Sequence, residues 1–155
     1  MIELMYQKYY EEIRDYLCFN MRCSEEASDI AQDVFIKLSK QEISEIDNVR
    51  AWLYKVAINY SRNRFKRATL FLKYINYSML NENQYEEIKL SDEEQKFEIL
   101  KRSIQKLNEE DRTLILLYRD ELSYKEISEI TGIKFSSVGK KLSRAINKLK
   151  KIVGE

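Results

Sequence analysis

The sequence predicts an all-α protein made of two small helical domains joined by a flexible linker. Its 155 residues include no proline and only three glycines, so the chain lacks the turn punctuation that strand meanders need. Apolar residues recur at helical spacing in two blocks, which lie on either side of a polar central stretch. The length suits one ordinary domain or two small ones, and a 44% hydrophobic content is enough to form a core.

The first block, residues 1–67, is expected to hold three helices. An apolar stripe that begins at Met5 and ends near Phe19 marks the first. Ser24 can cap the second, whose inner face would consist of Ala27, Ile30, Ala31, Val34, Phe35 and Leu38. A loop covers roughly residues 40–46. Asp47 or Asn48 then caps the third helix, with an apolar stripe of Val49, Trp52, Leu53, Val56 and Tyr60.

Residues 68–95 are interpreted as the linker, with room for a short helix, because their periodicity is weak and residues 81–94 are acidic and polar. The alternative is that this stretch packs as a further helix of a single globule.

The second block, residues 96–155, is also helical by its spacing. Phe97, Leu100, Ile104 and Leu107 mark one helix, and Asn108 caps the next. Ser123 and Glu126 have the spacing of a capping box, and the helix they start would end at Gly132. The last helix runs from about Phe135 to Ile152, with its inner positions at Val138, Leu142, Ala145 and Leu149.

The spacing within this block predicts a helix-turn-helix. A small residue, Ser128, is followed four positions later by Gly132 and six positions after that by the aliphatic Val138. The second helix would present hydroxyls and cations suited to base edges and phosphates in a major groove. The alternative is a helical hairpin with a solvated basic face. Gly139 is unfavourable in the middle of a helix, and it marks either a close approach to backbone or neutral drift.

The charge distribution indicates contact with a polyanion at two places. Residues 48–81 and 130–154 contain no acid, and each stretch holds seven Lys or Arg, although the net charge of the chain is only +1. In the first stretch, Trp52, Tyr54, Tyr60 and Phe65 alternate with the cations, which suits unstacked bases. Trp52 lies on the apolar stripe and is expected in the core. Tyr54 falls near the basic face and is the better candidate for a base, with exposure without function as the alternative.

Other features limit the possible functions. The chain has no His, and Cys18 and Cys23 alone cannot make an ordinary zinc site, so we expect two reduced thiols, with a redox pair as the alternative. No apolar run approaches the ~18 residues of a membrane span, and the N-terminus does not resemble a signal peptide. A cytoplasmic protein without membrane insertion, metal or cofactor is expected. An enzyme is not, because the chain has no phosphate-binding glycine loop and no nucleophile–base pair.

Three blocks of the chain resemble the extracytoplasmic-function (ECF) sigma factors of bacterial RNA polymerase. Residues 29–37, DIAQDVFIK, resemble the D-x-x-Q-[DE]-x-F-x-[KR] signature of the polymerase-binding helix. Residues 48–67, NVRAWLYKVAINYSRNRFKR, are similar to the helix that melts and contacts the −10 element. Residues 107–148 resemble the −35-binding domain. Together the blocks span residues 29–148, about 120 of the 155 residues.

This resemblance implies a role for each block. The polymerase-binding positions would be Asp29, Gln32, Asp33, Phe35 and Lys37, of which the polar ones meet the β′ coiled coil. The −10 DNA-binding positions would be Tyr54, Lys55, Asn59, Arg62, Asn63 and Lys66, with a flipped base held near the loop at 40–47. The −35 DNA-binding positions would be Lys134, Ser136, Ser137, Lys140, Lys141 and Arg144. Lys134 and Gly139 depart from the family pattern.

The implied partners are core RNA polymerase, through its β′ coiled coil and β flap, promoter DNA, and an anti-sigma factor. Promoter elements centred near −10 and −35 lie ~25 base pairs or ~85 Å apart. A single globule of this length would be only ~40 Å across. Two domains joined by ~27 residues, which extend to ~90 Å, could contact both elements.

Two other functions compete with this hypothesis. A stand-alone helix-turn-helix regulator that binds an operator as a dimer would explain the C-terminal block, but not the signature at residues 29–37. A helical adaptor that binds only protein would have no use for two acid-free basic stretches.

Overall fold

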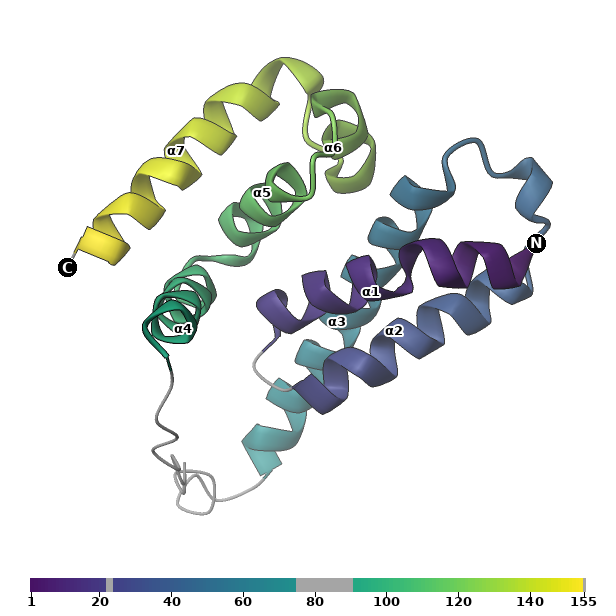
Figure 1. Cartoon of the computed structure of the whole chain (residues 1–155), viewed down its shortest axis with the longest axis horizontal. Helices are drawn as coiled ribbons and strands as arrows, with labels where there is room; N and C mark the ends of the chain where they lie inside the picture. The colour runs from purple at the N-terminus through teal and green to yellow at the C-terminus, as the bar shows by residue number, and fades with distance from the viewer. Residues whose placement is uncertain (22–23, 75–90, 155) are drawn as a thin grey trace.

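A computed structural model describes residues 1–21, 24–74 and 91–154, and the side chains of these residues except 71–74. Every regular element in these ranges is helical (Figure 1). The elements are α1 (Ile2–Asn20), α2 (Ser24–Ser39), the short 3₁₀ helix η1 (Ile43–Glu45), α3 (Val49–Tyr74), α4 (Asp92–Gln105), α5 (Glu109–Arg119), α6 (Tyr124–Thr131) and α7 (Phe135–Gly154). None of the helices in the described ranges has the length and apolar composition needed to cross a membrane.

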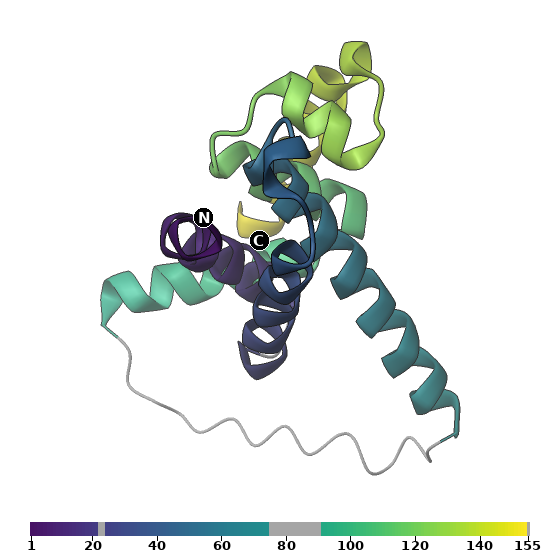
Figure 2. The same cartoon turned by 90° about the vertical axis from the view of Figure 1, so that its right-hand side faces the viewer.

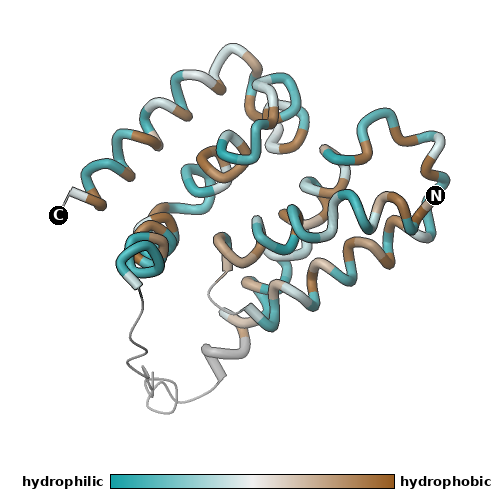
Figure 3. Tube along the Cα trace, viewed as in Figure 1, coloured by the Kyte–Doolittle hydropathy of each residue, from teal (hydrophilic) through white to brown (hydrophobic). Residues whose placement is uncertain are grey.

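The helices form two bundles. α1, α2 and α3 pack on one another and make the N-terminal bundle, while α4, α5 and α6 pack with α7 in the C-terminal bundle. Figure 3 shows hydrophobic positions recurring along α7 between hydrophilic ones, as the amphipathic spacing predicts. The expected inner face of α2 is confirmed, because all six of its residues are buried: Ala27, Ile30, Ala31, Val34, Phe35 and Leu38.

Most predicted helix ends are confirmed at the level of hydrogen bonds. Asn108 Oδ1 accepts from the Asp111 N–H at 2.9 Å, and Asn48 Oδ1 accepts from the Ala51 N–H at 3.0 Å. Ser123 and Glu126 form the expected capping box. Gly132 has φ +77°, in the left-handed region where glycine is favoured. Ser24, however, is the first helical residue of α2 rather than its cap.

The stretch predicted as linker is partly helical. α3 continues through residues 68–74, and α4 begins at Asp92, where Ser91 and Glu94 form a second capping box. The sequence S-D-E-E signals this helix start, whereas the acidic and polar composition around it favours a linker. Residues 75–90, the remainder of the predicted linker, lie outside the described residues.

The two bundles are docked against each other. α6 packs on α3, and both α4 and α5 pack on α1 (Figure 2). Phe19 of α1 meets the Phe97 ring edge-on at a centroid distance of 5.1 Å, and the Arg119 guanidinium lies 4.3 Å from the Phe19 ring centroid. Gln105 Nε2 donates to the Met21 carbonyl at 3.1 Å. Apolar, cation–π and polar contacts therefore all contribute to the docking.

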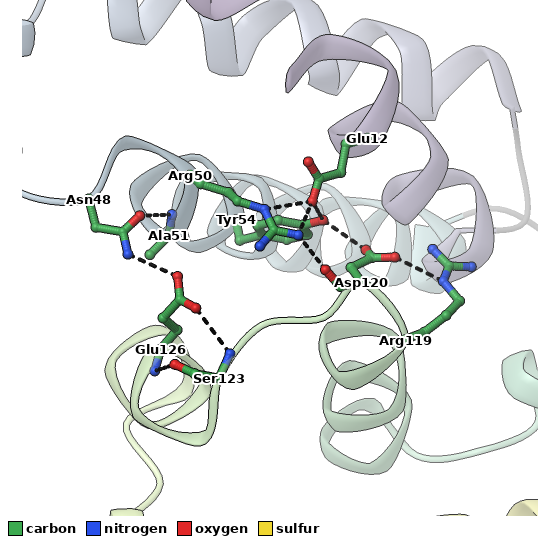
Figure 4. A network of polar contacts seen from close by, with 9 residues as sticks. All are labelled: Glu12, Asn48, Arg50, Ala51, Tyr54, Arg119, Asp120, Ser123 and Glu126. Carbon is green, nitrogen blue, oxygen red and sulfur yellow. Dashed lines mark hydrogen bonds and ion pairs between the residues drawn. The ribbon is translucent and has the colours of Figure 1, made fainter. Parts of the chain in front are cut away.

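A part-buried polar network lies in this interface (Figure 4). The Tyr54 hydroxyl on α3 lies 2.7 Å from Glu12 Oε1 on α1 and 2.8 Å from Asp120 Oδ2, just after α5. Its single hydrogen can be donated to only one carboxylate at a time. Arg50 supplies the remaining donors, because its Nε lies 2.8 Å from Glu12 Oε1 and its Nη2 donates to the Asp120 carbonyl. Burial, together with the Asp120 and Glu12 carboxylates, raises the pKa of the Tyr54 phenol far above its usual value.

A second link lies beside this network. Asn48 Nδ2 donates to Glu126 Oε2 at 2.9 Å, and thereby joins the start of α3 to the first turn of α6. Partial burial would raise the pKa of Glu126, but hydrogen bonds from Ser123 and Asn48 outweigh it and hold this pKa below its usual value. Glu126 therefore both caps its own helix and contacts the other bundle.

Replacing Tyr54 with Phe should weaken the docking of the two bundles. The ring is kept, but two part-buried carboxylates lose their phenol partner, so we expect the free energy of unfolding to fall by about 1–3 kcal/mol. Denaturant unfolding measures this loss, and small-angle scattering should show a larger radius of gyration. Tyr118→Phe is the matched control, because Tyr118 is 52% exposed. Equal stability and equal size of the two variants would contradict the role of Tyr54.

Alkaline pH should destabilise the folded chain. Burial raises the pKa of Tyr16 to about 12. Tyrosines of the unfolded chain lose their proton near pH 10, whereas Tyr16 in the folded chain keeps its proton. The contribution of Tyr16 to the free energy of unfolding is thus complete below pH 10. It is lost as the pH rises from about 10 toward 12. Urea unfolding at pH 8, 10 and 11 should show this decline, and a smaller decline in Tyr16→Phe. An identical pH dependence of the two proteins would rule the mechanism out.

Candidate nucleic-acid interface

The outer face of α2 presents the predicted polymerase-binding residues to solvent. Asp29, Gln32, Asp33 and Lys37 are all exposed. Phe35 is buried, and its ring meets Tyr6 edge-on at a centroid distance of 5.2 Å. Phe35 therefore belongs to the core beneath this face, whereas the four polar residues are available to a partner.

Contacts between α2 and α3 connect this face to the basic helix. Asp33 Oδ2 lies 4.0 Å from Arg64 Nη2, and Lys37 Nζ lies 5.5 Å from the Tyr60 ring centroid. Both contacts are partly exposed, so they are weak and sensitive to salt. Through the first contact, Asp33 on the outer face of α2 lies beside the cation Arg64 of α3.

The predicted −10 set on α3 divides into two groups. Lys55, Asn59, Asn63 and Lys66 are exposed, and their spacing of i, i+4, i+8 and i+11 places them in one row along the helix. The hydroxyl of Tyr54 and the guanidinium of Arg62 are instead engaged with the C-terminal bundle. The exposed row is therefore the part of the set that is open to a nucleic acid in this structure.

The expectation that Tyr54 lies near the exposed basic face is wrong for this structure. Tyr54 is 0% exposed, and its hydroxyl is held between two carboxylates. Arg62 Nε donates to Glu109 Oε1, the first residue of α5. The sequence could not reveal either contact, because both partners lie far from α3 along the chain.

Among the α3 aromatics whose side chains the structure describes, Phe65 is the one open to solvent, with 73% of its surface exposed. Trp52 and Tyr60 are half-buried against the core, as the apolar stripe predicts. Phe65 also lines a groove of about 890 Å³ between the two bundles, together with Arg62, Arg64, Lys66 and Arg112. In the sequence, the position of Phe65 among cations indicates a possible contact with bases. Tyr54 has the same signal, and its spacing puts it near the basic face.

The loop predicted at residues 40–46 contains η1. Ile43 and Ile46 are half-buried against the core, while Glu42, Ser44 and Asp47 are exposed. The apolar residues fix the loop to the N-terminal bundle, and its polar side chains face solvent beside the start of α3.

The predicted −35 set on α7 also divides by face. Ser136, Lys140 and Arg144 are exposed in an i, i+4, i+8 row that lies opposite the buried Val138, Leu142 and Ala145. Lys134 is exposed in the turn, and Ser137 is half-buried. Lys141 lies on the flank toward α5, where its Nζ is 3.0 Å from Glu110 Oε1. Two turns further along, Lys148 Nζ lies 2.8 Å from Asp111 Oδ2.

The acids at the start of α5 contact cations of both predicted DNA-binding helices, and the sequence did not predict these contacts. Glu109, Glu110 and Asp111 fill the first turn after the Asn108 cap. There they suit the helix dipole, and they also contact Arg62, Lys141 and Lys148. Three adjacent acids after a cap were visible in the sequence, but their partners were not.

The exposed side chains of α3 and α7 can neutralise phosphates and donate hydrogen bonds. Within residues 1–21, 24–74 and 91–154, no three thiol or carboxylate groups converge in a way that could hold a metal ion.

Comparisons with known proteins assign both bundles to one family. The family descriptions "Sigma-70 region 2" and "Sigma-70, region 4" match residues 5–70 and 97–149 respectively. The RNA polymerase sigma factor YlaC of Bacillus subtilis (strain 168) is 32% identical, over 97% of this chain and 90% of its own length. The ECF RNA polymerase sigma factor SigW of the same organism is 30% identical, over 87% and 80%.

A solved structure supports the fold. The sigma factor RpoE of Bartonella quintana, crystallised with the anti-sigma factor NepR, is similar with a TM-score of 0.75 over 98% of this chain and 96% of that chain. Its sequence identity is 19%, so the likeness concerns the arrangement of helices.

Neutralising the acids at the start of α5 should strengthen binding to a polyanion. Glu109→Gln and Glu110→Gln release Arg62 and Lys141 and remove one negative charge each. Exposed ion pairs are worth about 0.2–1 kcal/mol, so we expect a rise in affinity for duplex DNA of up to about fivefold at low salt. Fluorescence anisotropy over a salt series measures this affinity. Glu11→Gln, an exposed acid of α1, makes the same charge change away from these cations. An equal rise in this control would show that only net charge matters.

Proposed function

Since this chain belongs to the ECF sigma factors of RNA polymerase, which direct promoter-specific transcription, we propose that its two bundles divide that task. The N-terminal bundle of α1, α2 and α3 binds core polymerase and the −10 element, and the C-terminal bundle of α4 to α7 binds the −35 element. The observation that carries this division is the pair of exposed basic rows on α3 and α7, one in each bundle. The stand-alone dimeric regulator is not favoured, because the family match includes region 2.

The α2 face docks on the β′ coiled coil of core polymerase. Asp29, Asp33, Gln32 and Lys37 are exposed on one side of a rigid helix whose other side is fully buried. A rigid polar face can be matched by a complementary partner surface without the cost of ordering a loop. The C-terminal bundle is proposed to meet the β flap.

The exposed row on α3 contacts −10 DNA. Lys55 and Lys66 neutralise phosphates, and Asn59 and Asn63 offer amide donors and acceptors to bases. Phe65 replaces Tyr54 as the aromatic proposed for an unstacked base. The flipped base is held near the loop at residues 40–47.

The exposed row on α7 enters the major groove of the −35 element. Ser136, Lys140 and Arg144 face the duplex, and Lys134 stands at the entry of the helix. Lys141 and Ser137 are on the flank, where Lys141 exchanges Glu110 for a phosphate.

Simultaneous contact with both elements requires the bundles to separate. The elements lie ~85 Å apart along the duplex, whereas here α6 is packed against α3. Separation exposes Tyr54 and frees Arg62 from Glu109. We therefore assign the docked arrangement to the protein before it engages promoter DNA.

An anti-sigma factor is a further proposed partner, and the groove between the bundles is the proposed place for it. Of the residues that line this groove, Arg62 and Lys66 belong to the −10 set, so a protein in the groove would block promoter contact. The protein acts in the cytoplasm, where polymerase and promoter are, and it performs no catalysis of its own.

Reconstitution with core polymerase tests this function. The wild-type chain should confer initiation at discrete promoters when transcription is run on a genomic fragment library. Asp33→Lys should abolish co-purification with core polymerase, because it reverses a charge on the docking face and faces Arg64. Asp47→Lys, an exposed acid outside that face, is the control. Equal co-purification of the two variants would overturn the α2 assignment, and the absence of promoter-specific transcripts would overturn the function.

A further inference from the structure

Phe135 is an exposed aromatic residue at the first position of the recognition helix α7. It is 62% exposed, although Val138, one turn further along the same helix, is fully buried. The core of the C-terminal bundle therefore does not require this ring. Neither the helix-turn-helix pattern nor the −35 set predicted from the sequence gave Phe135 a role.

Gly139 keeps the ring of Phe135 uncovered. The two residues are four apart and share one flank of α7. Long side chains on a helix point back toward its N-terminus, so most residues at position 139 would extend over Phe135. Gly139 has no such side chain. The Tyr124 ring from α6 lies alongside instead, with its Cε2 at 3.5 Å from where a Cβ on Gly139 would be.

The rings of Phe135 and Tyr124 are both open to solvent. Tyr124 is 41% exposed, and Phe135 more so. Next to the rings, Lys134, Ser136 and Lys140 are exposed. This combination is complementary to a ligand that places an apolar group between anionic ones. The major groove does this at thymine, whose 5-methyl group lies between two rows of phosphates.

We propose that Phe135 determines part of the −35 sequence preference by contacting the 5-methyl group of a thymine. The ring approaches the methyl from the N-terminal end of α7, the end that enters the groove most deeply in helix-turn-helix proteins. Tyr124 borders the contact, and Gly139 leaves the room for it. This inference rests on the proposed binding of α7 to the −35 element, and it adds a base contact that the cations and hydroxyls of the row do not supply.

Transcription from a promoter library with a randomised −35 region tests the assignment. Holoenzyme with the wild-type chain should select thymine at one position, on either strand. Phe135→Ala should lose that preference and keep the others. Alanine favours the helix and the ring is exposed, so the variant should fold. Tyr118→Ala, which removes an exposed ring from α5, should select the same sequences as the wild type.

Deoxyuridine at the selected position isolates the methyl group. Wild-type holoenzyme should bind this duplex about fourfold more weakly than the thymine duplex, the effect of one lost methyl contact. Phe135→Ala should bind both duplexes equally. The inference fails if the variant selects the same thymine, or if it keeps the full sensitivity to deoxyuridine. If the wild-type chain selects no −35 sequence at all, the proposed function fails instead.

Discussion

The docking of the two bundles depends on the hydroxyl of Tyr54. This hydroxyl lies within hydrogen-bonding distance of a carboxylate from α1 and a carboxylate that follows α5. These two part-buried carboxylates would repel each other without the phenol between them and the Arg50 guanidinium on Glu12. Because the donors come from α3 and one acceptor comes from the other bundle, this network is satisfied only when the bundles are docked. The placement of α6 against α3 follows from it.

The sequence was sufficient for most of the fold because local signals determine most helix ends. The caps at Asn48 and Asn108, the capping box at Ser123 and the left-handed Gly132 depend on neighbours within a few residues. The inner face of α2 follows from its period alone. The extension of α3 through residues 68–74 was missed, because a helix can continue without strong amphipathic spacing. The exposure of Phe97 and Leu100 was also not predictable, since it depends on which face of α4 the other elements cover.

The composition of the sequence located the candidate site, but it did not predict which residues of the site contact each other. Acid-free stretches located both basic helices, and the spacing of Lys55, Asn59 and Lys66 gave one exposed row. The sequence could not show that Arg62 and Lys141 have acids of α5 as neighbours, because these pairs are 47 and 31 residues apart. Tyr54 illustrates the same limit. A tyrosine at the edge of a basic face has the same local sequence whether solvent or a second bundle covers it.

The continuation of α3 to Tyr74 shortens the tether between the two bundles. A helical residue advances ~1.5 Å and an extended one up to ~3.6 Å, so residues 68–74 span ~10 Å instead of ~25 Å. Between Tyr74 and Asp92, the chain can reach at most ~65 Å. This limit is less than the ~85 Å between the two promoter elements, and the dimensions of the bundles must supply the difference. Under the proposed division of roles, this reach sets an upper limit on the spacer between the two promoter elements that the protein can bridge.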